Sequence, residues 1–466
     1  MPATPNLPLE RLRDAIREND AQAASELLER HPDLGRSDLG IACALGDVEF
    51  VTTSLANDPT AAERACGGGA WPPLFHACAS PFHARDASTA DALAEVVRLL
   101  LAAGADPSGA VAWVPDAGAV RLPALYFACE RGSAAVARVL LEHGAEPNDG
   151  ESIYHAAQFD RRACLELLLA HGADVSVRHA AWGNTPLYFL LGHVEGAPGT
   201  ATADRGIRWL LEHGADPEVT SGPLAESALH CAARVGRAPG MITLLIAHGA
   251  RPSRARADGA TPYALALRYG NDATVSALAG AGADVSRVGP LDRLLAACHA
   301  GDAFGARTIL AAEPKLMEGS LEETHEQMSR AAARGNAPAL ELMLALGVPA
   351  HSEKPGASTP LHEAAWNGHA RCVALLLARG ALVNAREDEF GCSPLAWACH
   401  GSRHCREADE EYLAVVDQLL RAGADRASAL NRWGLPPEAM ARPAIATLLR
   451  DRGFAPAATT DRDDAS

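Results

Sequence analysis

The residues best suited to holding a metal ion lie near the C-terminal end of the sequence. His400, His404 and Cys405 follow a helical spacing of i, i+4 and i+5, and Cys392 and Cys399 precede them. Zn²⁺ prefers imidazole and thiolate ligands, but structural zinc sites normally use four ligands at closer, paired spacings. A packed helical turn explains the same residues, so we expect no metal site and no cofactor.

Signatures of catalysis are also missing from the sequence. It contains no GxSxG, P-loop, HExxH or protein-kinase pattern, and the glycines at 67–69 precede no GK[ST]. The 11 cysteines form no CxxC pair, and many stand where helices would otherwise carry alanine. They are typical of small buried thiols. We therefore expect the protein not to be an enzyme.

The start of the sequence and its hydropathy indicate the compartment. Residues 1–6 have neither the basic nor the apolar part of a secretory signal. No apolar run approaches the roughly 18 residues that a membrane span needs. We expect a cytoplasmic protein of the bacterial type that does not enter a membrane.

Length and charge exclude two further classes. The chain has 466 residues and is 48% hydrophobic. A single core seldom serves more than about 300 residues, so several domains or a repeat array are expected. The formal net charge of −17 argues against nucleic-acid binding.

The sequence repeats itself in two linked phrases. One has the form LLxxGAxP or LLxxGAxV and recurs around eight glycines: Gly104, Gly144, Gly172, Gly214, Gly249, Gly282, Gly380 and Gly423. The other is complete over 359–369 as TPLHEAAWNGH and partial at 185–188 and 261–263. Thr-Pro supplies an N-cap hydroxyl and a proline at the first helical position, while the glycine suits a left-handed helix end.

These phrases resemble those of the ankyrin repeat family, and the resemblance extends over residues 9 to 455. It implies an all-α fold, an ankyrin-repeat solenoid of helix-turn-helix units with β-turn fingers and about 12 to 13 repeats. Short amphipathic helices, such as 361–366 and 370–378, bury their apolar faces only by stacking on neighbouring units.

One unit indicates a division of the array. Residues 9–34 align without gaps with residues 291–316, so a unit typical of a terminal cap recurs in mid-chain. We expect one array over 1–288 with about eight repeats and a second over 289–455 with about five. One unbroken solenoid with a degenerate repeat is the alternative. Residues 456–466 are predicted to form a disordered acidic tail.

Three repeats are longer than the others. Additional residues at 81–92, 195–205 and 401–411 are predicted to form loops and an extra helical turn between the two helices. A finger at 108–122 contains Trp113. Insertions on one face often mark a binding face, although neutral drift produces them as well.

The family resemblance implies that a partner lies along a concave groove formed by the fingers and first helices. Candidate partner-binding residues at these variable positions are Arg131, Phe159, His193, Arg234, Arg268, Tyr269, His299, Arg334, Trp366 and His400. Arginine and aromatic side chains suit an unidentified protein or an acidic peptide. We predict a non-catalytic scaffold or adaptor that is a monomer.

The alternative function is an enzyme. In that case His193, His299, Tyr269 and Arg268 would act on a substrate held between the groove and the insertions, in a closed pocket with a perturbed histidine. For the scaffold, replacing Arg234, Arg268 and Arg334 together by Glu should abolish partner capture with little change in thermal unfolding.

Overall fold

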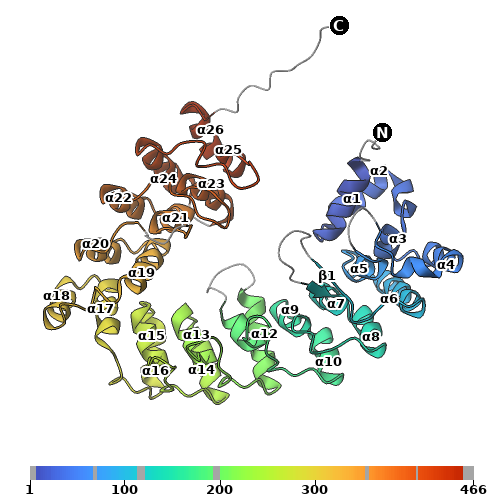
Figure 1. Ribbon diagram of the computed structural model, residues 1–466, viewed down its shortest axis with the longest axis horizontal. Coiled ribbons are helices and arrows are strands. Elements are labelled where there is room, and N and C mark those ends of the chain that lie inside the picture. The colour runs from blue at the N-terminus through green and yellow to red at the C-terminus, as the bar shows by residue number, and fades with distance from the viewer. Residues whose placement is uncertain are drawn as a thin grey trace, which may run out of the picture. The chain divides into compact units, whose positions relative to one another are not determined.

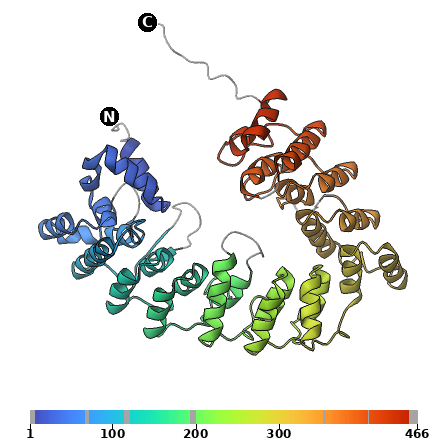
Figure 2. The same cartoon turned by 180° about the vertical axis from the view of Figure 1, so that it is seen from behind.

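The computed structural model describes residues 7–66, 71–112, 121–192, 200–351, 356–405 and 408–454. Over these ranges twenty-six α-helices, α1 to α26, follow one another as thirteen pairs. Within each of the two units defined below, consecutive pairs lie side by side in chain order (Figures 1 and 2). The predicted all-α fold of stacked helix pairs is confirmed. We call the odd-numbered helix of each pair its first helix.

The pair α21 (Pro360–Trp366) and α22 (Ala370–Ala378) shows how the phrases fold. The Thr359 hydroxyl accepts a hydrogen bond from the His362 amide, and Pro360 occupies the first helical position. The chain reverses at Gly368 and leaves α22 at Gly380, whose φ angles of +73° and +81° favour glycine. The helix starts and stops are thus those the sequence predicts.

The buried side of each pair is narrow and apolar. Leu361 and Ala365 of α21 and Val373 and Leu376 of α22 are fully buried. They pack against the neighbouring helix pairs, so the core continues from repeat to repeat. All eleven cysteines are free thiols, and all except Cys66 and Cys405 are buried, as expected.

The chain forms two compact units. The first comprises residues 1–262 and 276–283, and the second comprises 263–275 and 284–466, so the division runs through α16. The predicted boundary between residues 288 and 289 stays a prediction, as does the choice between two arrays and one. Residues 456–466 lie outside the described residues.

The elements up to α16 have the following bounds: α1 Leu7–Arg17, α2 Ala21–Arg30, α3 Leu39–Leu45, α4 Val48–Asn57, α5 Pro73–Cys78, α6 Ala87–Ala102, β1 Ala110–Ala112, β2 Arg121–Pro123, α7 Ala124–Arg131, α8 Ala134–Glu142, α9 Ser152–Gln158, α10 Arg162–Ala170, α11 Pro186–Leu191, α12 Thr200–Glu212, α13 Ala228–Val235, α14 Pro239–Ala247, α15 Pro262–Arg268 and α16 Asp272–Gly280. Short 3-10 helices cover Pro32–Arg36 and Pro59–Ala62.

The remaining helices are α17 Pro290–His299, α18 Ala303–Ala312, α19 Leu321–Ala333, α20 Ala337–Ala345, α21 and α22 as above, α23 Pro394–His404, α24 Asp409–Arg421, α25 Pro437–Met440 and α26 Pro443–Asp451. No helix in the described part of the chain is both long and apolar enough to cross a membrane.

The insertions lengthen second helices. Helix α6 has 16 residues and helices α12 and α24 have 13 each, against 9 in α22. This confirms the predicted extra helical turn. The finger is an antiparallel hairpin of β1 and β2 in which Val111 pairs with Leu122. Trp113, like residues 195–199 and 406–407, lies outside the described ranges.

Candidate partner-binding surface

The candidate residues occupy equivalent places in successive repeats. Each described one lies near the C-terminal end of a first helix or just beyond it: Arg131 (α7), Phe159 (α9), Arg234 (α13), Arg268 and Tyr269 (α15), His299 (α17), Arg334 (α19), Trp366 (α21) and His400 (α23). His193 lies outside the described residues. The first three belong to the first unit and the others to the second.

The two candidate partner-binding arginines of the first unit lie close to carboxylates. Arg131 lies 2.9 Å from Glu130, and its side chain is only 7% exposed. Burial lowers the pKa of Arg131 from its ordinary value. Arg234 lies 3.4 Å from Glu226. Neighbouring acids therefore offset both positive charges.

The arginines of the second unit are tied into the protein as well. Arg268 bonds to Asp292 at 2.7 Å and pairs with Glu323. Arg334 donates to the carbonyl of Tyr269 and to the side chain of Asn271, both at 2.8 Å. Much of the expected surplus of positive charge is therefore internally compensated.

This pairing changes the expectation for the triple glutamate variant. A glutamate at position 268 would place a third carboxylate beside Asp292 and Glu323 in a largely buried site. Burying an unpaired charge is strongly destabilising. We therefore expect the triple variant to unfold at a lower temperature than the parent, contrary to the expectation from the sequence.

Aromatic rings are the feature that continues between repeats of the first unit. Tyr126 of α7 meets the His155 ring of α9 edge-on at 4.9 Å, and His155 lies 5.8 Å from Phe189 of α11. Phe159 stacks on His155 at 6.5 Å and is 36% exposed. We call Tyr126, His155, Phe159 and Phe189 the aromatic row. Sequence reasoning identified only Phe159, because the others lie about one helical turn earlier.

A second aromatic group lies in the other unit. Trp366 contacts Trp397 at 5.7 Å and His400 at 5.2 Å, and the His400 and His404 rings lie 4.4 Å apart. Tyr412 from the lengthened α24 donates to the Trp366 carbonyl at 2.5 Å. These histidines thus form part of an aromatic cluster. Among the described residues, no group of three or more His, Cys, Asp or Glu could hold a metal ion.

The three described residues of the alternative enzyme, Arg268, Tyr269 and His299, are packed into the protein. His299 lies under the backbone of Gly270, and burial lowers the pKa of His299 to about 4, with Arg334 acting in the same direction. Tyr269 is 6% exposed, and its ring lies under Arg330 at 4.6 Å. Neither of the two pockets described next is lined by these residues.

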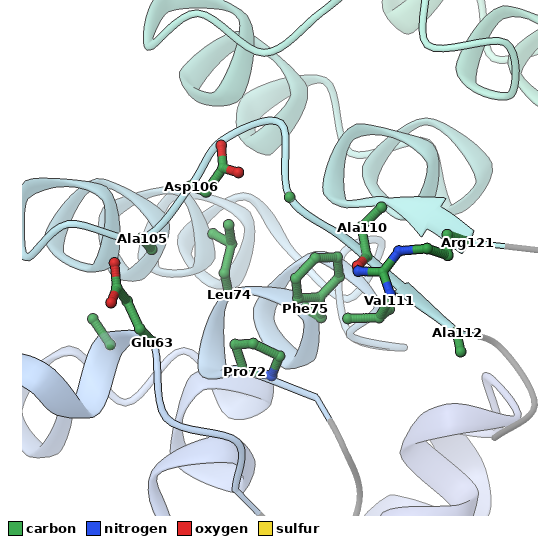
Figure 3. A pocket seen from close by; sticks show the side chains of 12 residues that line it. Glu63, Pro72, Leu74, Phe75, Ala105, Asp106, Ala110, Val111, Ala112 and Arg121 are labelled. Atoms are coloured by element: carbon green, nitrogen blue, oxygen red, sulfur yellow. The ribbon is translucent and has the colours of Figure 1, made fainter. Parts of the chain in front are cut away.

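One pocket of about 410 Å³ lies beneath the hairpin in the first unit (Figure 3). Leu74 and Phe75 of α5 and Val111 of β1 provide apolar walls. Glu63, Asp106 and Arg121 add charge, and the Arg121 guanidinium is hydrogen-bonded to the Ala110 carbonyl. The pocket is therefore predominantly apolar.

A second pocket, of about 280 Å³, lies beside the aromatic row. Six of its lining residues are Glu151, Tyr154, His155, His179, Trp182 and Phe189. Glu151 lies 3.3 Å from His155 Nε2 and 3.1 Å from His179 Nε2. Although burial alone would raise the pKa of Glu151, these hydrogen bonds lower it below its ordinary value. The sequence analysis missed this pocket, whose one local signal is the i, i+4 spacing of Glu151 and His155.

Comparison with known proteins adds a family match. A family model described as ankyrin repeats (3 copies) matches residues 86–179, 201–288 and 328–428. These segments contain six of the thirteen helix pairs in full.

Relatives with known names match parts of the chain. It is 38% identical over 127 residues to human cyclin-dependent kinase 4 inhibitor B, covering 25% of this chain and 86% of that protein. It is 36% identical over 109 residues to ankyrin repeat and SOCS box protein 16 of Mus musculus, covering 23% of each. The chain thus spans less than a quarter of the mouse protein. The solved ankyrin repeat domain of human ASB11 shares 28% identity, with a TM-score of 0.38 and coverage of 55% of this chain and 99% of that one.

Proposed function

Because this chain belongs to the ankyrin repeat family, we propose that it is a non-catalytic scaffold or adaptor that binds a partner protein along the ends of its first helices. Ankyrin repeats are generally protein–protein interaction modules. The expected cytoplasmic location, bacterial type and monomeric state belong to the same proposal.

The observation that carries the proposal is the aromatic row. Its rings come from the first helices of three consecutive repeats, and Phe159 is partly open to solvent. Aromatic side chains dominate binding energy at protein interfaces because they bury a large area with little loss of side-chain entropy. Phe159 is therefore the anchor that we assign in the first unit, and Trp366 with the exposed His400 is its counterpart in the second.

Charge has a smaller part in this proposal than the sequence suggested. Carboxylates of the protein already pair with Arg131, Arg234 and Arg268, so a partner must compete with them. The hydrogen bonds of Arg334 go to neutral oxygen atoms. An acidic group of an unidentified protein or peptide is best received at Arg334.

The test is affinity capture from the native cell with the full chain carrying Phe159→Asp and His400→Asp. The matched control is Phe304→Asp, because Phe304 is 83% exposed on α18, a second helix. We expect the double variant to lose the captured proteins and the control to retain them, while thermal unfolding of both stays near that of the parent. Equal capture by all three proteins would contradict the proposed face.

A further inference from the structure

The pocket beside the aromatic row combines a small volume with a carboxylate that is only 14% exposed. We call it the Glu151 pocket, after the carboxylate at the start of α9. Its volume of about 280 Å³ is below the roughly 300–1,000 Å³ of sites for drug-sized ligands. The pocket therefore suits one small headgroup better than a whole cofactor.

Hydrogen bonds around His179 define the charge of the pocket. The backbone amides of Ala181 and Trp182 both lie 3.1 Å from His179 Nδ1, so this atom is an acceptor and carries no proton. The proton of the ring is then on Nε2, which donates to Glu151 at 3.1 Å. His179 is thus a neutral donor, and it leaves the negative charge of Glu151 uncompensated.

The positive side chain next to His179 in the sequence is held elsewhere. Arg178 precedes His179, but its guanidinium donates to the carbonyls of Gly183 and Thr220 at 3.0 and 2.5 Å. His155 also contacts Glu151, and its two ring nitrogens face Glu151 Oε2 at 3.3 Å and Gln158 Oε1 at 2.9 Å, so a protonated His155 would offset the carboxylate at low pH. At a pH where histidine is generally uncharged, Glu151 supplies the charge of the pocket.

The walls of the pocket are aromatic. Tyr154 lies 5.8 Å from Phe189 and 6.0 Å from His179, and Trp182 lies 6.2 Å from His179. The faces of such rings are electron-rich and attract cations. Trp182 is 68% exposed, so a bound ligand can cover it without displacing other residues.

Most hydrogen-bond acceptors of the pocket are already engaged. Both oxygens of Glu151 have histidine partners, and the Asn184 backbone carbonyl accepts from the Tyr154 hydroxyl at 2.8 Å, whereas Asn184 Oδ1 is buried without a partner. A primary ammonium brings three donors and a guanidinium five, more than this one oxygen can accept. An ammonium whose nitrogen is covered by alkyl groups brings charge without such donors.

We propose that the Glu151 pocket binds an alkylated ammonium group, with Trp182, Tyr154 and Phe189 facing the cation and Glu151 balancing its charge. A free small molecule of the choline type and a methylated lysine of a protein share this chemistry. The inference goes beyond the scaffold function, because it concerns one headgroup whatever molecule carries it.

The experiment measures binding to the full chain at pH 8 by calorimetry and by tryptophan fluorescence. The probes are choline, its uncharged isostere 3,3-dimethylbutan-1-ol, and two peptides that differ only in carrying trimethyllysine or lysine. We expect saturable choline binding and at least about fivefold weaker binding of the isostere, as one cation–π contact implies. Tighter binding of choline identifies a free ligand, and tighter binding of the trimethyllysine peptide identifies a protein ligand.

Two variants test whether Trp182 and Glu151 contribute to binding of the cation. Trp182→Ala removes an exposed ring and should weaken binding about fivefold, with a similar loss for Glu151→Gln. Trp433→Ala is the matched control, because Trp433 is 69% exposed and also precedes a glycine in a turn between repeats. Equal affinity for choline and its isostere, an unchanged affinity in Trp182→Ala, or no saturable binding of any charged probe would overturn the proposal. Partner capture through Phe159 would persist in that case, so the two proposals fail separately.

Discussion

The guanidinium of Arg268 donates a 2.7 Å hydrogen bond to the carboxylate of Asp292, and these side chains are only 11% and 6% exposed. Arg268 ends α15 and Asp292 lies in the first turn of α17, so the pair joins the first helices of consecutive repeats. Asp292 also accepts a hydrogen bond from the Gly289 amide at 2.8 Å. Arg268, which the sequence suggested as a partner-binding residue, thus connects two repeats.

Removing this arginine should destabilise the second unit. Arg268→Ala leaves Asp292 buried without its cation, and breaking such a pair costs about 3 kcal/mol. The matched change Arg307→Ala affects an exposed side chain of α18 and should cost less than about 0.5 kcal/mol. Urea unfolding followed by circular dichroism measures both values. Equal losses for the two variants would show that the pair does not stabilise the unit.

A glycine next to this pair should also resist substitution. Gly270 has a φ of +63°, and a Cβ there would lie 2.6 Å from Cγ of His299. Gly380 has a φ of +81° with nothing within 4 Å of such a Cβ. Gly380→Ala should therefore cost about 1 kcal/mol for its backbone conformation alone. We expect Gly270→Ala to lower the free energy of unfolding clearly more, and the idea fails if the order is reversed.

Buried histidines should make stability depend on pH. Burial lowers the pKa values of His83, His299 and His362 to about 4, whereas an unfolded histidine titrates near 6.5. Below pH 6.5 the unfolded chain binds more protons, so stability is full above that pH and falls as the pH drops toward 4. Asp149 and Glu363, whose pKa values burial raises, act in the opposite direction but are fewer.

Urea midpoints at pH 7.5, 6.5 and 5.5 measure this dependence. We expect them to decrease toward pH 5.5, and less steeply in His362→Gln than in the parent. The control is His31→Gln, since His31 is exposed. A flat profile in the parent, or the same change of slope in both variants, would rule out the assigned role of buried His362.

How far the sequence predicted the structure depends on the range of each interaction. Thr359 and Pro360 specify a helix start locally, and the structure confirms that start. No repeat phrase indicates that His179 and Trp182 line the same pocket as Glu151 of the preceding repeat. Such contacts depend on how repeats stack, which spacing within one repeat does not encode.

The charge of the candidate face also depends on contacts between repeats. Counting residues along the first helices revealed the arginines but not their partners, because Asp292 lies 24 residues beyond Arg268 in the next repeat. The aromatic row is likewise assembled from three repeats. Equivalent positions in the repeats therefore identify the candidate face. Its net charge cannot be predicted in the same way, because it depends on residues of neighbouring repeats.

The central claim, that a partner protein contacts the ends of the first helices, is tested most directly by site-specific photo-crosslinking in the native cell. A photoreactive phenylalanine derivative is placed at position 159, 400 or 304 of the full chain, where the native side chains are all exposed. The account predicts crosslinks to the same partner from 159 or 400 and none from 304. Crosslinks from position 304 alone, or from none of the three, would contradict it.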